Sequence, residues 1–60
     1  MPNDFPRDPF ILLSFINMKL RDCYPSMQAL CEDCDVSQAE IDAVLQAAGF
    51  AYDVSLNKYW

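Results

Sequence analysis

Apolar residues recur at helical spacing in three consecutive segments of the chain. At roughly 100° per residue, one face of the first segment holds Leu12, Leu13, Ile16, Leu20 and Cys23. The second segment repeats the spacing i, i+3, i+4, i+7 with Met27, Leu30, Cys31 and Cys34, and the third with Ile41, Val44, Leu45 and Ala48. We therefore expect helices over roughly Pro9–Cys23, over Met27–Cys34, and between Ser37 and Gly49.

Start and stop signals support these boundaries. Asp8 and Ser26 are suited to cap the first two helices, because their side-chain oxygens can accept free backbone N–H groups. Ser37 and Glu40 have the spacing of a capping box for the third helix, and Val36 with Ile41 fits the hydrophobic staple around it. Pro25 should end the first helix and Gly49 the third.

The first helix also carries a second apolar stripe, formed by Ile11, Phe15 and Met18. A helix that is apolar on two sides has to be covered on both. Either the C-terminal segment covers this second stripe, which we favour, or the stripe contacts a partner or a second copy of the chain.

The ends of the chain do not continue the helical pattern. Residues 1–8 hold two prolines and should form an extended N-terminal segment. At the other end, Phe50–Tyr52 and Lys58–Trp60 flank a turn at Asp53–Asn57, which predicts a short β-hairpin resting on the helices. We predict one small domain over residues 1–60, mostly α, with three helices in a helix-turn-helix-like arrangement and a short, wing-like C-terminal hairpin.

The charge distribution argues against the DNA-binding function that such a scaffold suggests. The net charge is −5, and between Pro25 and Leu56 there is no lysine or arginine. The same stretch contains six acids, which are Glu32, Asp33, Asp35, Glu40, Asp42 and Asp53. The outward face of the third helix therefore lacks the cations that contact phosphate and guanine. Nucleic-acid binding by a winged-helix variant stays as an alternative, and a protein-binding use of the scaffold is preferred.

Three cysteines and no histidine are present. Cys31 and Cys34 form a CxxC motif, and Cys23 could be a third metal ligand, but a zinc site needs a fourth. A redox CxxC usually begins a helix, whereas this one ends a helix beside acids that should raise the thiol pKa. We expect the cysteines to pack in the core and expect no cofactor. A cysteine-based metal or redox protein is the weaker hypothesis.

No segment approaches the ~20 apolar residues needed to span a bilayer, and nothing resembles a signal peptide. We therefore expect a cytoplasmic protein without membrane contact. The chain has no glycine-rich phosphate loop and no histidine, so we do not expect an enzyme. Asn17 and Arg21 form a polar strip that either bonds within the chain or contacts a partner.

The segments Lys19–Asp22, Leu30–Asp33 and Tyr52–Asp53, together with Asn17, resemble a family of short, uncharacterised bacterial proteins of unknown function. The resemblance covers nearly the whole chain, with Phe5 and Pro6 peripheral to it. It implies a free-standing bacterial protein and brings no activity, ligand or catalytic residue.

We expect a non-catalytic protein-interaction module, with a homodimer as one version of it. The candidate partner-binding residues are Ile11, Phe15, Asn17, Met18, Arg21, Tyr52, Tyr59 and Trp60.

Overall fold

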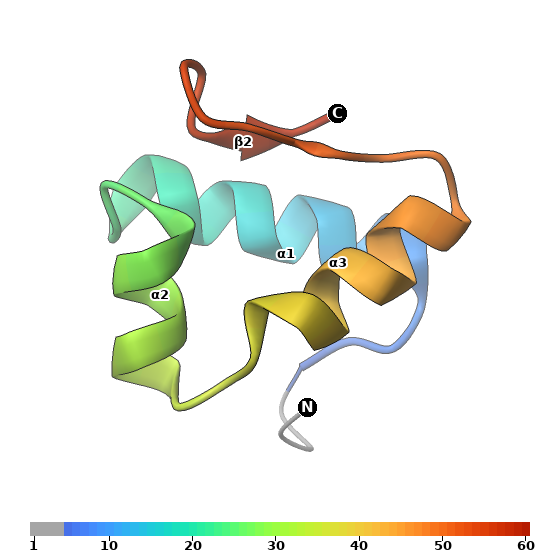
Figure 1. Cartoon of the computed structure of the whole chain (residues 1–60), viewed down its shortest axis with the longest axis horizontal. Helices are drawn as coiled ribbons and strands as arrows, with labels where there is room; N and C mark the ends of the chain where they lie inside the picture. The colour runs from blue at the N-terminus through green and yellow to red at the C-terminus, as the bar shows by residue number, and fades with distance from the viewer. Residues whose placement is uncertain (1–4) are drawn as a thin grey trace.

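The computed structural model describes residues 5–60 and contains the three predicted helices and the C-terminal hairpin (Figure 1). The elements are α1 (Pro9–Asp22), α2 (Met27–Cys34), α3 (Gln38–Ala47), β1 (Tyr52–Asp53) and β2 (Lys58–Tyr59). The strands form an antiparallel pair in which Tyr52 faces Tyr59 and Asp53 faces Lys58. Residues 1–4 of the predicted N-terminal segment lie outside the described part of the chain.

Local sequence signals set most of the helix ends. The Asp8 carboxylate accepts the N–H groups of Phe10 and Ile11 at 2.9 and 3.2 Å, and the Ser26 hydroxyl accepts that of Ala29 at 3.2 Å. At the end of α3, Gly49 has φ +90°. The backbone there closes the last turn through two bonds, from Gly49 N–H to the Gln46 carbonyl and from Phe50 N–H to the Leu45 carbonyl.

The predicted capping box at Ser37 is wrong in one respect. Within the described residues, the Ser37 side chain makes no cap hydrogen bond, although its carbonyl accepts the Ile41 N–H at 3.3 Å and begins the helix as expected. Ile41 is fully buried, and Val36 packs against the same core. Tertiary packing therefore stabilises α3 even though Ser37 supplies no side-chain cap, as is common for helices in folded domains.

The core lies where α1 meets the other elements. One face of α1 buries Leu12, Ile16 and Leu20, and the rest of the core comes from Phe5, Met27, Leu30, Ile41, Leu45 and Tyr59. In Figure 1 the hairpin runs along one side of α1, and α2 lies across the end at which α1 finishes. Cys23 was predicted on the core stripe, but it is exposed, because α1 ends at Asp22 and the backbone turns away.

The C-terminal segment does not cover the second apolar stripe of α1. Ile11 and Met18 remain 60% and 42% exposed. Phe15 is covered from the other end of the chain, by Phe5, whose ring centroid lies 5.0 Å from its own in an edge-to-face arrangement. The N-terminal segment thus supplies a core residue, since Phe5 is only 8% exposed.

The radius of gyration is 10.2 Å, against ~10.4 Å for a compact chain of this length. A single copy of the chain is therefore as compact as is typical for a folded domain of this length. Among residues 5–60, no helix combines the length and the apolar character that crossing a membrane requires.

Candidate functional site

The hairpin is attached to α1 through the side chain of Asn17. Its Nδ2 donates to the Tyr59 carbonyl at 2.9 Å, and its Oδ1 accepts the Tyr59 N–H at 2.8 Å. Ala51 and Trp60 exchange both of their backbone bonds, so the next pair, Tyr52 and Tyr59, is a non-hydrogen-bonded one. The backbone N–H and carbonyl of Tyr59 therefore point out of the hairpin. The Asn17 amide forms hydrogen bonds with both of them, as the backbone of a third strand would.

A second asparagine ties the hairpin to the junction between α1 and α2. Asn57, at φ 53°, donates through Nδ2 to the carbonyls of Leu20 and Tyr24 at 3.2 and 3.1 Å. Its Oδ1 accepts the Tyr52 hydroxyl at 2.6 Å, and the same hydroxyl oxygen accepts the Met27 N–H at 3.4 Å. This network satisfies carbonyls at the end of α1 and one N–H at the start of α2.

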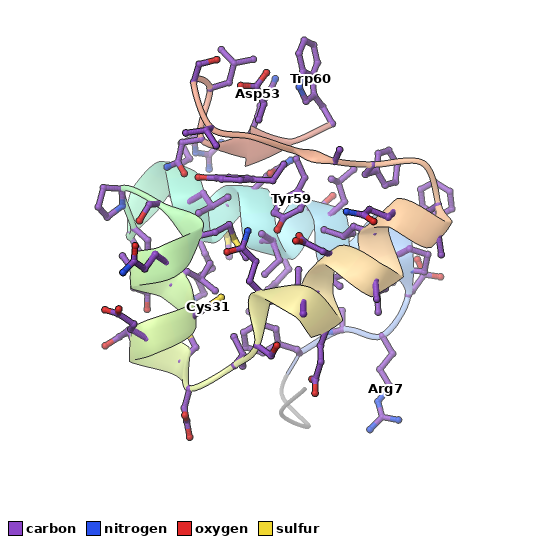
Figure 2. All side chains as sticks on the ribbon, viewed as in Figure 1. Arg7, Cys31, Asp53, Tyr59 and Trp60 are labelled. Atoms are coloured by element: carbon purple, nitrogen blue, oxygen red, sulfur yellow. The ribbon has the colours of Figure 1, made fainter. Side chains whose placement is uncertain are left out.

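Tyr59 completes the attachment from the inner face of the hairpin. Its side chain is 1% exposed and points toward the helices, whereas Asp53 and Trp60 lie on the outer side (Figure 2). The hydroxyl donates to Asp42 on α3 at 2.5 Å. Burial, and then the hydrogen bond to Asp42, raises the pKa of Tyr59 above its usual value.

An open groove of about 860 Å³ runs between α1 and the hairpin, and we call it the α1–hairpin groove. It is lined by Leu13, Ser14, Asn17, Met18, Leu20, Arg21, Leu56, Asn57 and Lys58. Of the described residues, those that line it include two cations and no acid.

Exposed apolar side chains adjoin this groove. Met18 and Leu56 line its two walls and are 42% and 51% exposed. Ile11 lies seven residues before Met18 on the same helix face. Trp60 is 64% exposed, and the Lys58 ammonium lies 4.9 Å from its ring centroid. Of these exposed apolar side chains, Met18 and Leu56 line the groove, whereas Ile11 and Trp60 lie outside its lining.

Arg21 lies at the rim of the groove and is already paired. Its Nε and Nη2 donate to the two carboxylate oxygens of Asp22 at 3.0 and 3.2 Å, and its side chain is 75% exposed. The hydrogen bond from Arg21 lowers the pKa of Asp22. The pairing of Arg21 with a nearby acid is confirmed, and Arg21 still borders the groove.

The predicted partner-binding residues fall into three groups. Ile11, Met18, Arg21 and Trp60 are exposed, Met18 and Arg21 line the groove, and for all four partner contact stays a prediction. Phe15, Asn17 and Tyr52 are half-buried and engaged within the fold. For Tyr59 the prediction is wrong, because its side chain is buried.

Leu13, Leu56 and Lys58 were missed as groove residues. Alternation along the last strand puts Lys58 and Trp60 on one face and Tyr59 on the other, which could have revealed that Lys58 is exposed.

The cysteines are free thiols. Cys31 and Cys34 pack half-buried against the core, and the Tyr24 hydroxyl lies 3.7 Å from the Cys34 sulfur. Burial, with the nearby Asp42 carboxylate adding to it, raises the pKa of the Cys31 thiol. The part of the chain that the structure describes contains no group of three or more potential ligands placed to hold a metal ion. A raised pKa lowers the thiolate fraction, which works against redox or nucleophilic use of Cys31.

The fold and the groove define a small helical domain with an attached hairpin. A family model described as a domain of unknown function, DUF4250, matches residues 6–59, and the chain belongs to this family. The comparisons with curated proteins and with solved structures gave no match. The match confirms the predicted resemblance to a family of unknown function and assigns no activity or ligand.

Proposed function

We propose that this protein is a small, non-catalytic protein-interaction module and that it binds its partner through the α1–hairpin groove. The observation that carries this proposal is the pair of exposed apolar side chains, Met18 on α1 and Leu56 on the hairpin, that line the two sides of the groove. Exposed apolar patches with a polar rim mark interaction sites on soluble domains. Here the rim is formed by Arg21 and Lys58.

The attachment of the hairpin supports a preformed surface. The two walls of the groove are joined by hydrogen bonds from the side-chain amides of Asn17 and Asn57 to backbone groups 33 to 42 residues away in the chain. A wall held in this way loses little conformational freedom on binding, so more of the contact energy is left for affinity.

Charge favours a protein partner over nucleic acid. Duplex binding commonly involves ~6–10 phosphate contacts, and the whole chain has four lysines and arginines. Two of these cations line the groove, and the acidic stretch from Pro25 to Leu56 would repel a phosphate backbone.

Capture of partners from the native host with surface variants tests this proposal. Met18→Glu and Leu56→Glu place a charge in the groove. Val54→Glu, also in the hairpin and 79% exposed, is the matched control because Val54 does not line it. We expect quantitative mass spectrometry to find a protein captured by the wild type and by Val54→Glu and lost with both groove variants. Equal capture by all four proteins, with circular dichroism showing intact folds, would contradict the proposal.

A further inference from the structure

The charge of the α1–hairpin groove is opposite to that of the chain as a whole. The protein has nine acids, four cations and a net charge of −5. The nine described residues that line the groove nevertheless include Arg21 and Lys58, and none of them is acidic. The lining of the groove thus carries both of its charges as cations, although Asp22 and Asp53 lie next to them outside the lining.

The groove also presents apolar side chains to solvent. Met18 and Leu56 are exposed and Leu13 is half-buried, and the volume of about 860 Å³ is in the upper range for binding sites. Ser14, Asn17 and Asn57 add uncharged polar groups to the lining. Because the groove is open along the helix and the hairpin, it fits side chains that project from a chain segment better than an enclosed small molecule.

From these observations we infer that the α1–hairpin groove binds an acidic, apolar peptide segment of a partner protein. Carboxylates of the segment would pair with Arg21 and Lys58, and its aliphatic or aromatic side chains would pack on Met18 and Leu56. This inference rests on the proposed function and specifies the chemistry of the partner. Charge complementarity is the reason for choosing this occupant over a neutral or basic one.

The existing contacts of both cations are compatible with this occupant. The side chains of Arg21 and Asp22 are 75% and 53% exposed, and exposed pairs of this kind are weak. An incoming carboxylate can therefore share or replace Asp22 as the acceptor for the guanidinium. The Lys58 ammonium lies over the Trp60 ring, and among the described residues no ion pair joins it to a carboxylate, although Asp53 is its neighbour across the hairpin.

Selection from a displayed library of random linear peptides tests the inference without assuming a sequence. We expect enriched peptides to carry a net negative charge and at least two large apolar residues. Their binding should fall at least tenfold in the double variant Arg21→Glu/Lys58→Glu, and by a smaller factor in Arg21→Gln/Lys58→Gln. Arg7→Glu is the matched control, because Arg7 is an exposed cation on the side of the molecule away from the hairpin (Figure 2). Binding to this variant should stay within twofold of the wild type.

Several results would overturn the inference. These are enriched peptides that are neutral or basic, no enrichment at all, or equal losses in Arg7→Glu and in the groove variants. Concentration-dependent dimerisation that the groove variants abolish would identify a second copy as the occupant instead. If a captured partner depends on Met18 and Leu56 while the selected peptides are not acidic, the proposed function stands and this inference fails.

Discussion

Replacement of Asn17 by alanine should release the hairpin from α1. The change removes both bonds from the Asn17 amide to the Tyr59 backbone, at 2.9 and 2.8 Å, and leaves one N–H and one carbonyl without partners in a half-buried position. At ~1–2 kcal/mol per unpaired group, the two groups together give an expected loss of unfolding free energy of about 2–4 kcal/mol. A single-core domain of this size is stabilised by only ~3–5 kcal/mol, so Asn17→Ala should lose roughly 40% of its stability or more.

Urea unfolding measures this loss, followed by far-ultraviolet circular dichroism for the helices and by fluorescence of Trp60, the single tryptophan, for the hairpin. We expect the fluorescence midpoint to fall by ~2 M or more, because the slope for so small a chain is ~1 kcal/mol per M. Ser14→Ala, one turn earlier on the same helix and exposed, should change stability by less than ~0.5 kcal/mol.

Asn17→Asp provides a second control with a defined pH dependence. At neutral pH its carboxylate can accept the Tyr59 N–H but repels the Tyr59 carbonyl, whereas the protonated acid can donate to that carbonyl. The folded-state pKa of this aspartate should therefore lie above its unfolded value of ~3.9. Relative to the wild type, stability should be greatest below pH ~4 and fall as the pH rises through the folded-state pKa. A loss below ~0.5 kcal/mol in Asn17→Ala, or no pH dependence in Asn17→Asp, would refute the role assigned to Asn17.

Three further changes test other parts of the fold. Phe5→Ala should cost about 2–3 kcal/mol in thermal or urea unfolding, because Phe5 is buried against Phe15, and a negligible loss would show that the N-terminal segment is not part of the core. Gly49→Ala should cost about 1 kcal/mol through its φ of +90° alone, because no atom of the described residues beyond Gly49 and its two chain neighbours lies within 4 Å of the added Cβ; an unchanged urea midpoint would contradict this. Burial raises the pKa of Tyr59 in the folded protein. The stability that the protonated phenol contributes is therefore complete below its pKa of ~10 in the unfolded chain, and it decreases above that pH by ~1.4 kcal/mol per pH unit. The difference between the wild type and Tyr59→Phe in urea titrations should therefore change between pH ~9 and ~11, and a constant difference would speak against the buried phenol.

The helices could be predicted from sequence because their determinants are local. Apolar stripes, the caps at Asp8 and Ser26, and the glycine at the end of α3 all act within one or two turns. The hairpin followed from two short apolar segments around a polar turn, where Asp53 accepts the N–H groups of Ser55 and Leu56.

The placement of the hairpin depends on contacts that no local pattern contains. Asn17 and Tyr59 are 42 residues apart, and nothing near Asn17 indicates that its amide replaces a neighbouring strand. The contact of Phe5 with Phe15 joins a proline-rich segment to a helix. The apolar content of that N-terminal segment was too low to suggest that it contains a core residue. Since the hairpin docks over Asn17 and not over Met18, the groove and its exposed apolar wall follow from this unpredicted geometry.

The most direct test of the central claim, that the α1–hairpin groove is the binding surface, is an NMR titration of the labelled protein with the partner segment that selection or capture identifies. The account predicts that the largest amide shifts map to Met18, Arg21, Leu56 and Lys58. Shifts concentrated on the outward face of α3, at Ala43, Gln46 and Ala47, with the groove unaffected, would contradict it.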